Sequence, residues 1–116
     1  MRWRRVAFAL LTLIFGAAAL FHLLAIFDTS LDDSSPTWRH ALFVGMNVAC
    51  CAGFSIRPPP FVYLFGLLVV QQLGSHGLQA WRIWQIEQRF DWTSFGVLLV
   101  MPVALALLIA ERRAKP

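Results

Sequence analysis

The chain has 116 residues, of which 59% are hydrophobic and only 14% are charged. Soluble domains usually carry about 25% charged residues, so this composition predicts a membrane protein and leaves no room for a separate soluble catalytic domain. The formal net charge is +4, and basic residues flank the first and last apolar stretches. This placement is typical of anchors at a lipid surface and disfavours nucleic-acid binding.

Four stretches contain no Asp, Glu, Lys or Arg, and each is close to the roughly 20 residues needed to cross a bilayer. They are residues 6–27, 40–56, 58–81 and 92–110. Polar and apolar residues do not alternate within them, which excludes barrel strands and indicates helices. We therefore predict an all-α integral membrane protein, a single four-helix transmembrane bundle over residues 1–116. The expected spans are about 6–27, 38–56, 59–77 and 92–110.

The first stretch follows a basic segment, as in a signal peptide, but its apolar run continues to Phe27. That run is long for a signal core, so we expect an uncleaved first span. The positive-inside rule then places both termini in the cytoplasm, and we expect the inner membrane of a bacterium. The loop after the first span is acidic and should face outward. Its acidic residues, which we interpret as part of a solvated loop, are Asp28, Asp32 and Asp33.

The second span carries small residues at every fourth position, a pattern that lets another helix approach closely. They are Ala41, Gly45, Ala49 and Gly53. This face predicts contact with a second copy of the chain or with a larger membrane complex. The nearly opposite face of the same helix is more polar and holds His40, Asn47 and Cys51.

Cys50 and Cys51 are the only cysteines, and they are adjacent in the second span. Adjacent cysteines on a helix point about 100° apart, which disfavours a disulfide between them. The pair resembles the vicinal thiols of mercuric-ion transporters, which would imply transfer of a soft metal. Those proteins carry the pair on the first helix beside a proline, whereas this chain has it on the second without one. Two small thiols that pack as apolar residues are the alternative interpretation.

The third span follows a proline-rich turn, Arg57 to Pro60, and is followed by a segment with two alternative interpretations. Residues 78–91 form either a short interfacial helix or a continuation of the third span into water. Tryptophans at positions 38, 81, 84 and 92 indicate an aromatic belt at the outer boundary.

Three histidines fall near the predicted outer side, on three different helices: His22, His40 and His76. Polar side chains in a membrane usually face the bundle interior, so we predict a shared outer pocket. Its metal ligands would be these histidines, which could hold zinc, copper or a haem iron. A polar-headed ligand such as a quinone is an alternative. The predicted ligand-binding residues are Asn47, Gln71, Gln72 and Ser75.

No histidine spacing here is diagnostic of one metal or cofactor, and two structural interpretations compete with the pocket. Imidazoles near an interface can meet water, and glutamines can join helices by hydrogen bonds. The sequence thus predicts a small membrane protein that binds or transports a metal ion, haem or a polar-headed ligand. The alternatives are a non-catalytic accessory or assembly subunit of a larger membrane complex and, less favoured, a lipid- or quinone-modifying enzyme.

Overall fold

The computed structural model describes residues 1–32 and 34–115, so Asp33 of the acidic loop lies outside the described residues. Its regular elements are helices: α1 (Arg2–Phe27), α2 (Thr37–Ile56), α3 (Phe61–Glu87) and α4 (Trp92–Arg113). All four are long and apolar enough to cross a membrane. The prediction of an all-α chain with four such helices is confirmed.

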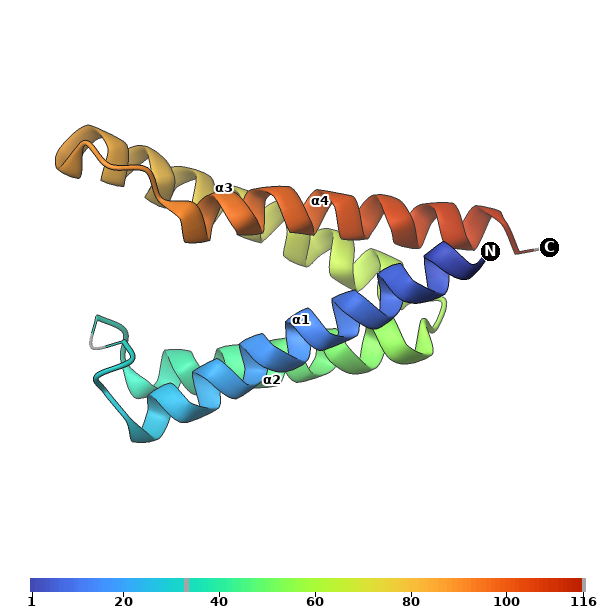
Figure 1. The fold of residues 1–116 in the computed structure, drawn as a ribbon, viewed down its shortest axis with the longest axis horizontal. Coiled ribbons are helices and arrows are strands. Elements are labelled where there is room, and N and C mark those ends of the chain that lie inside the picture. The colour runs from blue at the N-terminus through green and yellow to red at the C-terminus, as the bar shows by residue number, and fades with distance from the viewer. Residues whose placement is uncertain (33, 116) are drawn as a thin grey trace. The chain divides into compact units, whose positions relative to one another are not determined.

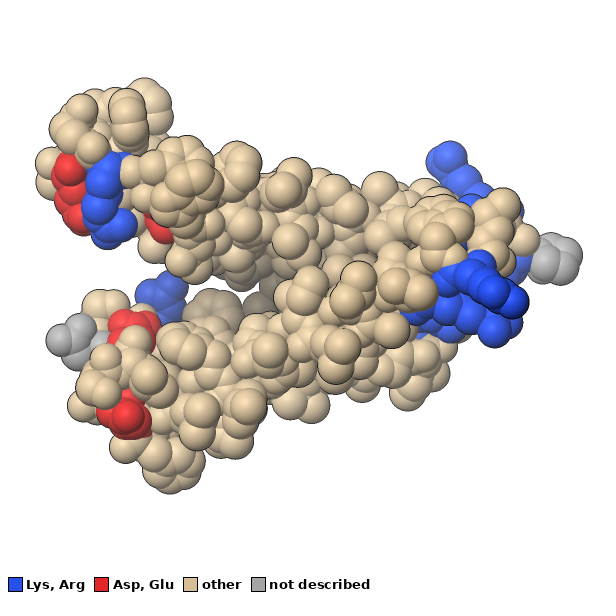
Figure 2. Space-filling view, viewed as in Figure 1, with Lys and Arg blue, Asp and Glu red and all other residues tan. Residues whose placement is uncertain are grey.

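The chain divides into two compact units, one up to Arg57 and the other from Pro58 onward. Each unit is a helical hairpin, with α1 beside α2 in the first and α3 beside α4 in the second (Figure 1). We call the end with residues 28–36 or 88–91 the loop end of its hairpin. In each hairpin, charged side chains gather at the two ends and the middle is uncharged (Figure 2). Such a distribution suits an element that crosses lipid.

In the first hairpin, aromatic side chains fill the contact between α1 and α2. Phe54 is fully buried and stacks on Phe15, with ring centroids 5.3 Å apart, and on Phe8 at 6.4 Å. Gly16 lies where a Cβ would meet the Cys51 sulfur at 3.7 Å, so a small residue here lets the two helices approach closely. The face of α2 that holds His40, Cys50 and Phe54 is therefore buried.

The small-residue face of α2 points elsewhere. Ala41, Gly45 and Ala49 are exposed, and a Cβ on Gly45 would meet nothing within 4 Å, whereas Gly53 is buried. Both cysteines are free, with Cys50 buried and Cys51 half-buried. The stripe is thus largely outside the contact between α1 and α2, and its predicted role in binding a partner stays a prediction.

In the second hairpin, α3 continues without interruption to Glu87 and ends at Gln88, which adopts a left-handed conformation with φ of 51°. Of the two alternatives for residues 78–91, the structure has the continuous helix. Asp91 then caps α4, because its side chain accepts a hydrogen bond from the Ser94 backbone nitrogen at 3.3 Å. A connection of four residues therefore suffices to reverse the chain.

Candidate functional site

His22 and His40 meet at the loop end of the first hairpin. His22 lies on α1, six residues before Asp28, and His40 lies in the first turn of α2. Their Nδ1 atoms are 3.0 Å apart, which is hydrogen-bond distance. His40 is only 2% exposed, whereas His22 is half-buried. We call these two residues the histidine pair.

Aromatic rings hold the His22 imidazole in one orientation. Its ring stacks on Phe43 with centroids 5.0 Å apart and an interplanar angle of 20°. Phe21 lies edge-on to it at 5.3 Å. The stacking on Phe43 covers one face of the imidazole, so the edge with the ring nitrogens is the part that can form hydrogen bonds.

Asp32 lies on the far side of His40. One of its carboxylate oxygens is 3.6 Å from Nε2 of His40, within ion-pair range but beyond hydrogen-bond distance. Hydrogen bonds from Ser34, 2.6 Å from its hydroxyl and 3.0 Å from its backbone nitrogen, hold the carboxylate. These bonds keep the pKa of Asp32 below its ordinary value, so the group is ionised at neutral pH.

This order of groups selects one arrangement of protons. A neutral imidazole carries a single N–H, and the Asp32 carboxylate favours the one on Nε2 of His40. Nδ1 of His40 then accepts a hydrogen bond from Nδ1–H of His22. The remaining nitrogen of His22, Nε2, is left with a lone pair. The histidine pair can therefore accept a proton or a hydrogen bond at His22, with Asp32 stabilising the positive charge through His40.

Metal and haem binding find less support in this geometry. Within residues 1–32 and 34–115, no group of three or more His, Cys, Asp or Glu is arranged to hold a metal ion. Two histidines that ligate one haem iron must lie on opposite faces of the macrocycle, whereas these nitrogens are in direct contact.

His76, the third predicted metal ligand, lies in the second hairpin. Its Nδ1 is 3.0 Å from the hydroxyl of Ser94, a fully buried residue of α4. The structure thus joins two of the three histidines to each other and the third to a serine. The shared pocket of three histidines stays a prediction.

The other predicted ligand-binding residues make local hydrogen bonds. The Asn47 amide donates to the Phe43 carbonyl, and the Ser75 hydroxyl donates to the Gln72 carbonyl, each within its own helix. The side chains of Gln71 and Gln72 bond to each other at 2.6 Å. Of these residues only Gln72 is buried. Their proposed role in ligand binding stays a prediction.

The two hairpins share a register that inspection of the sequence did not reveal. His22 and His40 are separated by 18 residues, as are His76 and Ser94, and each first-hairpin residue lies 54 positions before its counterpart. Other buried positions follow the same offset: Phe15 and Val69, Cys50 and Ala104, Phe54 and Leu108. Trp38 and Trp92 also correspond. Few of the paired residues are identical, so comparing the two halves of the sequence by residue identity gives only a weak signal for this repeat.

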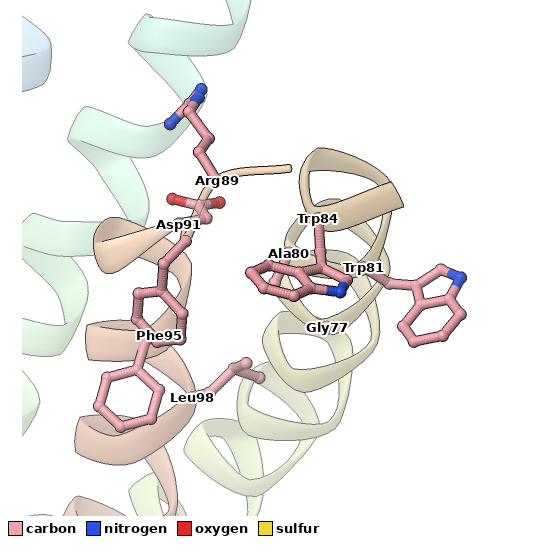
Figure 3. Close-up of a pocket in the computed structure, with 9 residues that line it drawn as sticks. Gly77, Ala80, Trp81, Trp84, Arg89, Asp91, Phe95 and Leu98 are labelled. Atoms are coloured by element: carbon pink, nitrogen blue, oxygen red, sulfur yellow. The ribbon is translucent and has the colours of Figure 1, made fainter. Parts of the chain in front are cut away.

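A cavity of about 310 Å³ opens at the loop end of the second hairpin. Asp91 and Trp84 lie on opposite sides of it, and the Arg89 side chain extends away from it (Figure 3). We call it the loop-end cavity. Its lining residues are Gly77, Ala80, Trp81, Trp84, Arg89, Phe90, Asp91, Phe95 and Leu98. This cavity was not predicted from the sequence, although an acid near four aromatic residues at a predicted membrane boundary was a visible signal.

Comparison with known proteins adds no relative. No protein-family model, no curated protein and no solved structure matches this chain.

Proposed function

We propose that this chain is an integral membrane protein that binds an apolar molecule bearing a hydroxyl group at the histidine pair. The ligand hydroxyl donates a hydrogen bond to Nε2 of His22. The observation that carries this proposal is the contact between His22 and His40, with Asp32 behind His40. Four apolar helices support the membrane setting, and the aromatic residues around His22 suit the apolar part of the ligand.

Burial explains why this ligand class is favoured over a metal ion. His40 is almost fully enclosed and already uses Nδ1 for His22, so of the two residues only the half-buried His22 keeps exposed surface. A single accessible nitrogen makes one good hydrogen bond but is a poor metal site, because zinc takes three or four protein ligands. A phenol or hydroquinone offers the matching donor together with an apolar ring.

Binding of decylhydroquinone to the purified protein in maltoside micelles tests the proposal. Its dimethyl ether is the matched probe, since it keeps the shape and loses both hydroxyl donors. We expect the ether to bind about tenfold more weakly, which corresponds to one buried hydrogen bond. Equal affinities for the two probes overturn the proposal.

Variants place the binding at the histidine pair. We expect His22→Ala to abolish the preference for the hydroquinone and Asp32→Asn to reduce it. Asp28→Asn is the control. It replaces a carboxylate of the same loop whose hydrogen bonds, among the described residues, are with Ser30 alone. A hydroquinone preference that survives His22→Ala contradicts the assignment, provided that circular dichroism shows unchanged helix content.

The membrane topology belongs to the same proposal. Both termini lie in the cytoplasm of a bacterium and both loop ends face the outer side, in accord with the basic residues at the start of α1 and at the end of α4. Alkaline phosphatase fused after residue 34 should be active in cells, and the same enzyme fused after residue 115 should be inactive. The opposite pattern overturns this orientation.

A second function, as an accessory subunit of a membrane complex, is favoured by one observation. Ala41, Gly45 and Ala49 on α2 are exposed, and a Cβ on Gly45 would meet nothing within 4 Å. A helix of another chain could pack there closely. Gentle detergent extraction should then recover a complex that Gly45→Leu disrupts and Val48→Leu leaves intact. Migration of the native protein as a monomer or a self-dimer contradicts the accessory function.

A further inference from the structure

We propose that the loop-end cavity of the second hairpin binds an organic cation, an ammonium group with apolar substituents, between Asp91 and Trp84. The site is separate from the histidine pair and uses residues of α3, α4 and their connection alone. Three features of the cavity carry the inference: a carboxylate oxygen without a partner, an aromatic lining and the placement of Arg89.

The first feature is the Asp91 carboxylate. The residue is only 8% exposed, and one oxygen accepts the Ser94 backbone N–H as a helix cap. The other oxygen, Oδ2, is buried and has no hydrogen-bond partner among the described residues. Capping α4 requires only the first oxygen. Neither the cap nor the rest of the hairpin therefore accounts for the burial of the second oxygen without a partner. A buried, unpaired carboxylate oxygen is costly, and a positive charge held in the adjacent cavity would reduce that cost.

The carboxylate is also charged under ordinary conditions. Burial by itself would raise the pKa of Asp91, but the hydrogen bonds from Ser94 and the nearby Arg89 and His76 outweigh it and lower the pKa below its ordinary value. Asp91 therefore presents a negative charge to the cavity at neutral pH.

The second feature is the aromatic lining. Trp84 faces Asp91 across the cavity (Figure 3). Phe90 and Phe95 complete the wall, and their ring centroids are 5.3 Å apart. The face of an aromatic ring carries partial negative charge and attracts cations, most strongly for Trp. An ammonium group that retains apolar substituents meets both the rings and the carboxylate. A small metal ion would leave the rings unused.

The third feature is that the one cationic lining residue is engaged elsewhere. The Arg89 guanidinium forms an ion pair with Glu87, and the side chain extends away from the cavity (Figure 3). Both of these side chains are exposed. Arg89 therefore makes no hydrogen bond to Oδ2 of Asp91, although its charge acts on the carboxylate from a distance. Its ion pair with Glu87 leaves the cavity with an attraction for a cation.

Calorimetric titration of the purified protein in maltoside micelles with benzyltrimethylammonium tests the proposal. Benzenesulfonate, an anion of similar size, is the matched probe and should not bind. Asp91→Asn should weaken binding of the cation about tenfold, and Trp84→Leu by a similar factor. Asn caps helices as well as Asp does, so α4 stays formed in the first variant. Trp84 is 49% exposed, so its replacement leaves the packing of α3 intact.

Trp38→Leu is the control, because Trp38 is an exposed tryptophan of α2 in the first hairpin and is not among the lining residues of the loop-end cavity. It should bind the cation as the native protein does. Equal binding of the ammonium and the sulfonate, or native affinity in Asp91→Asn, overturns the proposal.

A trimethylammonium group can belong to a free molecule or to a lipid headgroup, and the membrane composition separates the two sources. The titration is repeated in nanodiscs of phosphatidylcholine. If benzyltrimethylammonium no longer binds in these discs, the occupant is a lipid headgroup. Unchanged affinity identifies a free cation, and both results require the same carboxylate and rings.

Discussion

The first and second hairpins place a histidine at the same position and give it different partners. In the first hairpin His22 meets a second imidazole, and in the second His76 meets the hydroxyl of Ser94. The acid differs as well, since Asp32 lies in a loop beside His40 whereas Asp91 caps the helix that carries Ser94. The comparison teaches that one helical register can hold either a proton-accepting pair or a fixed hydrogen bond. The side chain on the second helix and the loop decide which.

Phe54→Ala should have the largest effect, because it removes the fully buried ring that joins α1 and α2. We expect a loss of about 3 kcal/mol in the free energy of unfolding, measured by titration with denaturing detergent. Leu108→Ala, at the corresponding position of the second hairpin, should cost about 2 kcal/mol because it removes fewer contacts. A larger cost for Leu108→Ala would break the correspondence between the hairpins.

His40→Ser gives the first hairpin the same pair of side chains that the second hairpin has. It should cost about 2 kcal/mol, because a buried imidazole is replaced by a much smaller side chain. A serine hydroxyl can donate or accept, so it no longer selects one tautomer of His22. In nitrogen NMR spectra, the His22 ring should change from one tautomer to a mixture, while His76 keeps its signal. An unchanged His22 spectrum contradicts the assigned order of protons.

Asp91→Ala should cost about 1 kcal/mol, since it removes the cap of α4. Asp32→Ala should cost less, because Asp32 caps no helix and its ion pair with His40 is longer than a hydrogen bond. Thermal unfolding followed by circular dichroism measures both. Asp91→Asn serves as the control and should keep most of the stability. If Asp91→Asn is as destabilising as Asp91→Ala, the cap depends on the charge of Asp91.

Acid should produce the smallest effect, and in both hairpins. Asp32 and Asp91 have pKa values below the ordinary 3.8. A lowered pKa means that the ionised group stabilises the folded state above about pH 4, and that this contribution is lost as the pH falls through the lower folded value. Melting temperatures should therefore fall as the pH drops below about 4. The melting temperature of Asp91→Asn should fall less steeply with acid. A steeper fall in this variant contradicts the direction of the Asp91 pKa shift.

Composition and charge-free length were enough to predict four membrane-length helices, because the cost of an unsatisfied backbone in lipid leaves few alternatives. The face of α2 that carries His40 and Cys51 was also predicted as distinct from the small-residue stripe, since helical periodicity fixes which residues share a face. The continuation of α3 to Glu87 was one of two alternatives that residues 78–91 left open.

The partners of each histidine were decided only by the tertiary structure. The spacing of His22 and His40 does not predict that their Nδ1 atoms meet. The loop between them sets the register of α2 along α1. The same holds for the loop-end cavity, which exists because α3 runs past the start of α4 before the chain turns. Helix length and polarity follow from local chemistry that the sequence contains, whereas the register between helices follows from packing across a loop.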